Sequence, residues 1–173
     1  MGNIQRAPVH EWQSRGALLK PYLMDISLAP KNIRIELTPT DHAAIVRVTF
    51  PPASSQFGAK YVCFSNLQWG DHGMDHSGQK AYVTGRATAV NSDRMLVTNF
   101  ALHMKATSEE AKAVVAQEDL LCFQYSMEVT TATIRIGTSL ISMSQVDTNM
   151  EREVPASKSF DDVLLETKNV WNK

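Results

Sequence analysis

Two Asp-His pairs stand four residues apart in the stretch QWGDHGMDHSG, residues 68–78. Two histidines and a carboxylate are ligands that zinc accepts in proteins. Asp71, His72, Asp75 and His76 are therefore weak candidates for a metal site. The glycines between them leave the backbone without a fixed geometry, and calcium would need more oxygen ligands than two aspartates supply. We expect no metal here and interpret the stretch as a variable, solvated connection between two strands.

The carboxylates best placed to do chemistry are Glu36 and Asp41, which bracket one predicted strand–strand turn. The simpler interpretation is that Glu36 forms an ion pair with Arg34 or Arg47 on a sheet face, while Asp41 shapes the turn. We predict no catalytic residue in this chain. Glu36, Asp41 and the adjacent His42 are kept as candidates for contacting a substrate.

Composition narrows the classes of partner. A chain of 173 residues suits one well-cored domain. With 17 Lys and Arg against 18 Asp and Glu, its net charge is −1, so no overall field attracts nucleic acid. No apolar run approaches the length of a membrane span, and the N-terminal residues lack the apolar core of a secretory signal. We therefore expect neither nucleic acid nor membrane as a partner, and the compartment stays unknown.

The two cysteines, Cys63 and Cys122, lie far apart, each inside an apolar stretch. Free cysteines in such surroundings behave as small buried hydrophobic residues. We expect two reduced thiols, while a single bridge between neighbouring strands stays open because the sequence does not exclude that geometry.

Short segments in which apolar and polar residues alternate recur along most of the chain, with turn residues between them. This pattern is typical of an antiparallel β-sandwich or barrel. The predicted strands cover residues 22–29, 33–38, 44–50, 60–67, 80–90, 94–104, 119–129 and 132–142. Residues 107–119 fit either a capped helix or a long loop.

The pattern changes to a helical one after residue 142. Ser144 with Asp147, and Ser159 with Asp162, have the spacing of a capping box. The residues that follow form one apolar helical stripe, which has to be buried either on the sandwich or on something beyond it. We treat these residues as candidates for a domain interface: Phe160, Val163, Leu164, Val170 and Trp171.

Two blocks of the sequence carry a further signal. The first contains a strand with an Arg-apolar-Gly pattern and two serines, an Asn-x-x-x-Glu helix, and a Phe-Asp-x-Val helix that ends in Trp. The second contains paired strands, a Glu-Leu-Thr-x-Thr turn and a Phe-Pro. The residues concerned are Arg135, Gly137, Ser139, Ser142, Asn149, Glu153, Phe160, Asp161, Val163 and Trp171, then Glu36, Leu37, Thr38, Thr40, Arg47, Phe50 and Pro51.

These blocks resemble the N-terminal domain of glycoside hydrolase family 92, the α-mannosidases. One position departs from the family, because its Thr-Glu-Arg is Thr40-Asp41-His42 here. An imidazole does not replace a guanidinium in a fixed hydrogen-bonding fork, which puts any sugar contact at this turn in doubt.

The resemblance implies a galactose-mutarotase-like supersandwich with one or two C-terminal helices. It divides the chain into a loose lead-in (1–20), the sandwich (21–143) and a helical linker (144–173) toward a catalytic domain that the chain lacks. The family enzyme is a calcium-dependent, exo-acting α-mannosidase, many of its members are exported, and its catalytic carboxylates and most of its calcium ligands lie in a following (α/α) barrel.

On this resemblance, the chain supports the binding of α-mannosylated glycans and pairs with the barrel domain in cis or in trans. Alone, it is predicted to be inactive and to hold no cofactor. It would be a gene-model fragment, a truncated product or one half of a split enzyme. The alternative is a free-standing β-sandwich that binds carbohydrate or a protein partner without catalysis.

Overall fold

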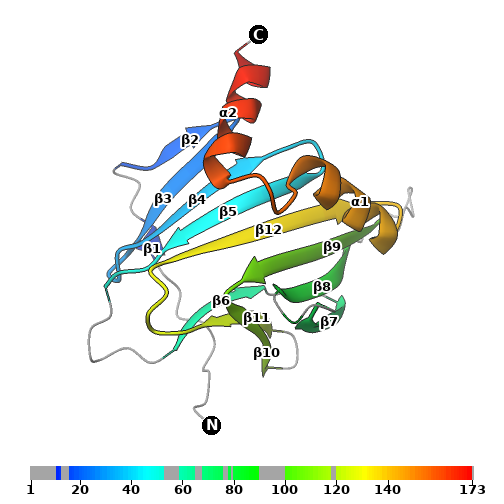
Figure 1. The fold of residues 1–173 in the computed structure, drawn as a ribbon, viewed down its shortest axis with the longest axis horizontal. Coiled ribbons are helices and arrows are strands. Elements are labelled where there is room, and N and C mark those ends of the chain that lie inside the picture. The colour runs from blue at the N-terminus through cyan, green and yellow to red at the C-terminus, as the bar shows by residue number, and fades with distance from the viewer. Residues whose placement is uncertain are drawn as a thin grey trace.

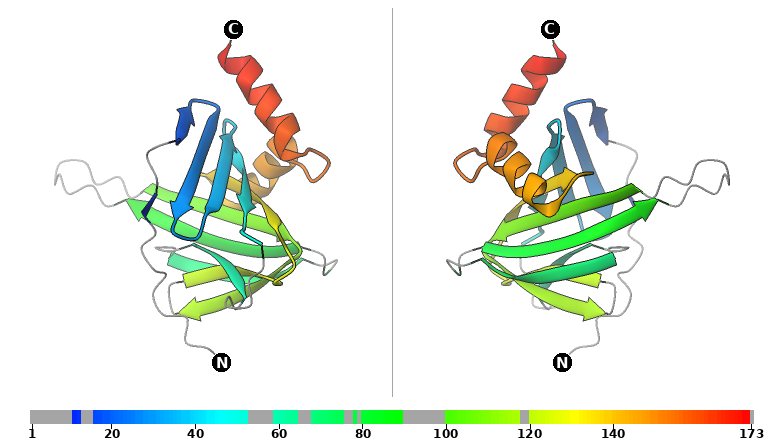
Figure 2. Two further views of the ribbon diagram at one scale, coloured as in Figure 1. Left: turned by 90° about the vertical axis from the view of Figure 1, so that its left-hand side faces the viewer. Right: turned by 90° about the vertical axis from the view of Figure 1, so that its right-hand side faces the viewer.

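The computed structural model describes residues 11–12, 16–52, 59–64, 68–75, 78, 80–89, 100–117 and 120–172. In these residues the chain forms two antiparallel sheets and two helices. Neither helix is long and apolar enough to cross a membrane. The sheets stack face to face, and the helices cover the outer face of the larger sheet (Figure 2). The predicted antiparallel sandwich with C-terminal helices is confirmed.

The larger sheet has nine strands within the described residues, in the order β1-β3-β4-β5-β12-β9-β8-β7, and β2 pairs with β3 (Figure 1). Of its central strands, β5 has apolar side chains buried on both faces, while β12 buries Ala132 and Ile134 on the face toward the smaller sheet. The strands are β1 (Glu11–Trp12), β2 (Leu18–Lys20), β3 (Leu23–Ala29), β4 (Ile33–Pro39), β5 (Ala43–Thr49), β7 (Gln68–Met74), β8 (Lys80–Ala89), β9 (Phe100–Glu109) and β12 (Thr131–Ser139).

The smaller sheet consists, in the described part of the chain, of β10 (Ala111–Gln117), β11 (Leu120–Tyr125) and β6 (Lys60–Phe64), with β11 in the middle. Alternate residues of β11 point into the sandwich, where Phe123 and Tyr125 are almost completely buried. Phe64 meets Phe123 edge to face, and Phe50 packs against Tyr125. This layer of aromatic and branched side chains is the main hydrophobic core of the domain.

Two helices, α1 (Met143–Glu153) and α2 (Phe160–Trp171), close the opposite face of the large sheet. They bury a second apolar cluster against β5, which includes Ile45, Val146 and Val163. Ser159 and Asp162 form the predicted capping box at the start of α2. At α1 the cap is Ser142, whose side chain accepts from the Gln145 N–H, and not Ser144.

Two predictions of local structure are wrong. The stretch interpreted as a solvated connection contains β7, an edge strand paired with β8. Residues 107–117 form neither a helix nor a loop, because β9 continues to Glu109 and β10 runs from Ala111 to Gln117. Glu110 makes the sharp turn between them with a positive φ of 61°. The strand expected at 94–104 lies at 100–109, and residues 90–99 are outside the described part of the chain.

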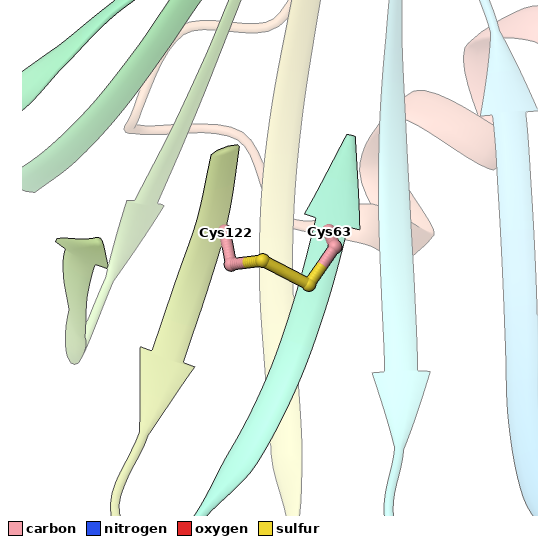
Figure 3. The surroundings of a disulfide bond; sticks show 2 residues. All are labelled: Cys63 and Cys122. Atoms are coloured by element: carbon pink, nitrogen blue, oxygen red, sulfur yellow. A yellow bond between two sulfur atoms is a disulfide. The ribbon is translucent and has the colours of Figure 1, made fainter. Parts of the chain in front are cut away.

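The prediction of two reduced thiols is also wrong. Cys63 on β6 lies directly opposite Cys122 on β11, and a disulfide joins them (Figure 3). The bridge therefore ties an outer strand of the three-stranded sheet to its central strand across 59 residues of sequence.

The close packing of α1 on the sheet is tightest at Gly137, in the middle of β12. A methyl group added there would overlap Cγ of Met150 and lie 3.0 Å from the Met150 sulfur and from Cγ1 of Val146. Real Cβ atoms essentially never approach another atom as closely as it would approach Met150 Cγ, so a larger residue would force Met150 or α1 to shift.

Replacing this glycine tests the contact. We expect Gly137→Ala to lower the free energy of unfolding by about 1–3 kcal/mol, since overpacking of a tight core costs that much. The smaller backbone flexibility of alanine recovers only ~0.4–1 kcal/mol. The free energy of unfolding is measured by denaturant titration.

A double-mutant cycle provides the control. In a Met150→Ala background the cost of Gly137→Ala should shrink, because the side chain that the new methyl group meets has been removed. Strictly additive effects of the two substitutions would contradict the proposed contact.

Candidate functional site

The predicted substrate contact Glu36 lies on β4, on the sheet face that the helices cover. It is 4% exposed, and both of its oxygens accept from Arg47, at 2.8 and 2.9 Å. Arg34 approaches the same carboxylate at 3.1 Å. The alternative interpretation of Glu36 as an ion-pair partner of Arg34 and Arg47 is therefore confirmed.

Arg47 extends this network to the start of α2. Its guanidinium lies over the ring of Phe160, 4.2 Å from the centroid, and donates to both carboxylate oxygens of Asp161 at 3.2 Å. A guanidinium can serve a carboxylate and an aromatic face at once because it is planar and has several donors. One arginine thus joins β4, β5 and α2.

The predicted residues Asp41 and His42 lie exposed in the turn between β4 and β5. Here the structure adds a partner that sequence reasoning missed, the carboxylate of Glu153 at the end of α1. Glu153 accepts from Thr40 Oγ1 at 2.7 Å and from the His42 backbone N–H at 2.8 Å, and it lies 3.0 Å from His42 Nδ1. Arg152 donates to it at 2.6 Å.

The Glu153 carboxylate is only 10% exposed, and its surroundings strongly favour the charged form. Partial burial acts to raise its pKa. Hydrogen bonds from Arg152, Thr40 and His42 outweigh burial and lower the pKa from 4.5 to about 2. Glu153 is therefore a fixed anion that anchors the turn bearing Asp41 and His42 to α1.

The weak metal candidates do not come together as a ligand set. Asp71 and His72 are neighbours on β7, so their side chains point to opposite faces of the sheet. Asp71 accepts from the His72 backbone N–H at 2.8 Å, and Asp75 accepts from the Lys80 backbone N–H at 3.2 Å. His76 lies outside the described residues.

Within the described residues, no group of three or more His, Cys, Asp or Glu side chains could hold a metal ion. These residues thus do not fit the calcium ion that the resemblance implies for the whole enzyme.

The interface candidates on α2 fall into a buried group and an exposed group. Phe160 and Val163 are buried against the sheet, and Leu164 is partly buried with them. Val170 and Trp171, at the far end of α2, are 65% and 60% exposed, as that end projects beyond the sheet (Figure 1). Leu165, which the sequence interpretation did not single out, is exposed on the same helix.

A pocket of about 420 Å³ lies between the large sheet and α1. Strands β8, β9 and β12 contribute its floor, and the second half of α1 with residues 154–157 contributes its wall. None of the predicted site residues lines it.

The anchoring role of Glu153 makes a prediction about pH. Because its pKa is lower in the folded chain than its ordinary value of 4.5, it stabilises the fold above pH 4.5, and this contribution is lost as the pH falls toward about 2. Because its partners His42 and Arg152 are more than half exposed, solvent screening reduces this contribution to about 1 kcal/mol. We expect Glu153→Gln to make the unfolding free energy less sensitive to acid, measured by denaturant titration from pH 7 to pH 2.5.

Glu151→Gln, on an exposed position of the same helix, controls for the change in net charge. Equal pH profiles for Glu153→Gln and the wild-type chain would show that Glu153 is not the anchor.

The fold of this chain can be compared with the folds of known proteins. No family model matches the sequence, and no curated protein matches it. A family 92 inverting mannosidase from Bacteroides thetaiotaomicron matches 94% of this chain with a TM-score of 0.68 and 17% identity. A family 92 glycosyl hydrolase matches 94% with a TM-score of 0.74 and 14% identity, and a family 92 α-mannosidase from Bacteroides thetaiotaomicron matches 94% with 0.71 and 12%.

The matches cover 23%, 25% and 24% of those three chains, so this chain spans about a quarter of their length. At such identities the likeness establishes the fold. The resemblance of the sequence to glycoside hydrolase family 92 is thereby confirmed as a shared fold.

Proposed function

We propose that this chain is a carbohydrate-binding-type domain of a calcium-dependent exo-α-mannosidase, which supports substrate binding but is not itself catalytic. The observation that carries this proposal is the fold match, which takes in nearly all of this chain and about a quarter of chains named as family 92 mannosidases. The proposed substrates are α-mannosylated glycans. Asp41 and His42, exposed in their turn, remain the proposed contacts.

The arrangement of carboxylates supports the non-catalytic part of the proposal. Inverting hydrolysis needs an acid and a base on either side of the glycosidic bond, with space for a water molecule. Glu36 is enclosed by arginines, and Glu153 accepts hydrogen bonds from the β4–β5 turn. Both carboxylates therefore have structural partners. In our proposal the catalytic acid, the base and most calcium ligands belong to an (α/α) barrel domain in cis or in trans.

The far end of α2 is the proposed contact with that barrel domain. Val170 and Trp171 are large apolar side chains at that end, both more than half exposed. Neighbouring exposed apolar side chains of this size suit a surface that another protein covers.

One observation favours the alternative of a free-standing sandwich that binds carbohydrate or a protein partner. Phe160 and Val163, which could have formed the centre of an interface, are buried against this chain's own sheet. The first half of α2 therefore needs no further domain to cover it.

Two measurements test the proposal. The purified chain is expected to release no mannose from α-mannosyl substrates, with or without calcium. If the coding sequence downstream of codon 173 encodes a helical barrel, that domain should bind this chain, and a Val170→Ser, Trp171→Ser variant should bind at least about tenfold more weakly, the equivalent of 1.4 kcal/mol.

Leu140→Ser with Ile141→Ser is the matched control, because it removes two equally exposed apolar side chains outside α2. Turnover by the chain alone would contradict the non-catalytic role. Unchanged binding by the Val170→Ser, Trp171→Ser variant would contradict the interface and favour the free-standing alternative.

A further inference from the structure

Three neighbouring strands form the floor of the pocket beneath α1, and their register fixes what lies at its centre. Thr107 of β9 is paired with Tyr82 of β8 on one side and with Arg135 of β12 on the other. Two residues along the same face, Lys80 of β8 is paired with Glu109 of β9. Because residues two apart share a face, a small hydroxyl side chain is surrounded by long charged ones.

Helix α1 supplies the wall. Asp147 and Glu151 are one turn apart and both line the pocket. Lys105, at the next position of β9 on the same face, donates to Asp147 at 2.6 Å and so links floor to wall. Arg135 donates to the backbone oxygen of Lys158 at 2.9 Å, which holds the segment that follows α1 in place.

Several polar groups in this pocket have hydrogen-bonding capacity to spare. Glu109 lies 3.9 Å from Lys80 Nζ and 3.9 Å from Arg135, too far for a hydrogen bond in either case. Neither the Thr107 hydroxyl nor the Glu151 carboxylate has a hydrogen-bond partner among the described side chains. These groups can all form further hydrogen bonds with a ligand in the pocket.

The charges indicate the class of ligand. The lining contains three basic residues, Lys80, Lys105 and Arg135, and three acidic ones, Glu109, Asp147 and Glu151. The acidic residues would repel an anion and the basic residues would repel a cation. The pocket as a whole therefore attracts neither kind of ion. A hydroxyl group both donates and accepts, and can therefore bridge Lys80 and Glu109 where they do not reach each other.

We infer that this pocket binds a neutral polyhydroxylated ligand, a single sugar residue. Its volume of about 420 Å³ is within the range of small-molecule sites. The inference rests on the proposed role in carbohydrate binding. It gives the domain a sugar position on a different face of α1 from Glu153, besides the turn that bears Asp41 and His42.

The test is a titration of the 15N-labelled chain with methyl α-D-mannopyranoside, followed by NMR. We expect saturable shifts at the backbone amides of Thr107, Glu109 and Glu151. Thr107→Val and Glu151→Gln keep the shape of each side chain while removing a hydroxyl or a charge, and each should raise Kd at least about fivefold. Thr133→Val, on the same sheet face outside the pocket lining, should leave Kd unchanged.

The outcomes separate this inference from the proposed function. Saturable shifts confined to the β4–β5 turn, with Kd unaffected by Thr107→Val and Glu151→Gln, would overturn the pocket and leave carbohydrate binding standing. Tighter binding of inorganic phosphate than of the mannoside at this pocket would overturn the neutral ligand. No saturable response to methyl α-D-mannopyranoside, methyl α-D-glucopyranoside or myo-inositol would overturn both the pocket and the carbohydrate-binding role.

Discussion

The close contact between α1 and β12 at Gly137 is the constraint on which the helical side of the domain depends. Since Met150 and Val146 occupy the space that a side chain at 137 would take, α1 lies directly on the sheet. The short distance between α1 and the sheet determines where two further features lie. The end of α1 brings Glu153 to the β4–β5 turn, and another face of α1 brings Asp147 and Glu151 over Thr107. The anchor and the pocket are two consequences of one packing contact.

Apolar burial and ion pairing have different roles on this face. The cluster around Ile45, Val146 and Val163 supplies most of the stabilisation, because each side chain fully removed from water contributes about 1.5–3 kcal/mol. A partly buried ion pair such as Glu36 with Arg47 gains much less, since the cost of taking these charges out of water offsets much of their attraction. What the ion pair contributes is the placement of α2 on the sheet. Arg47 can satisfy Glu36, Asp161 and the ring of Phe160 together only if α2 begins where it does.

Period-two alternation predicted most strands, and apolar residues at helical spacing predicted both helices, because these signals are local. The predicted cap was correct at α2 and wrong at α1, where Ser142 takes the place of Ser144. The signal failed at β7, an edge strand whose polar residues and glycines show no apolar alternation. The period-two signal also failed at 107–117, where helix-forming residues lie in two strands.

The pair Glu36–Arg47 could be predicted from neighbouring strands. The disulfide, the Glu153 anchor and the pocket could not, because each requires the register or packing of segments far apart in the sequence. A partial signal existed for the anchor, since Thr40 and Glu153 both belong to the blocks that resemble family 92.

The divided stripe on α2 links the two proposed roles of the domain. Phe160 and Val163 are covered by the chain's own sheet, and Thr167 donates to the backbone oxygen of Pro39 at 3.0 Å. These contacts fix the axis of the helix without help from another protein. Val170 and Trp171 lie about one turn beyond Thr167, so they are held at a defined place although nothing in the described residues covers them. An apolar surface that is already in position loses little conformational entropy when a partner covers it. The buried half of α2, which lets the domain stand alone, therefore also holds the exposed half in place as a surface for a partner domain.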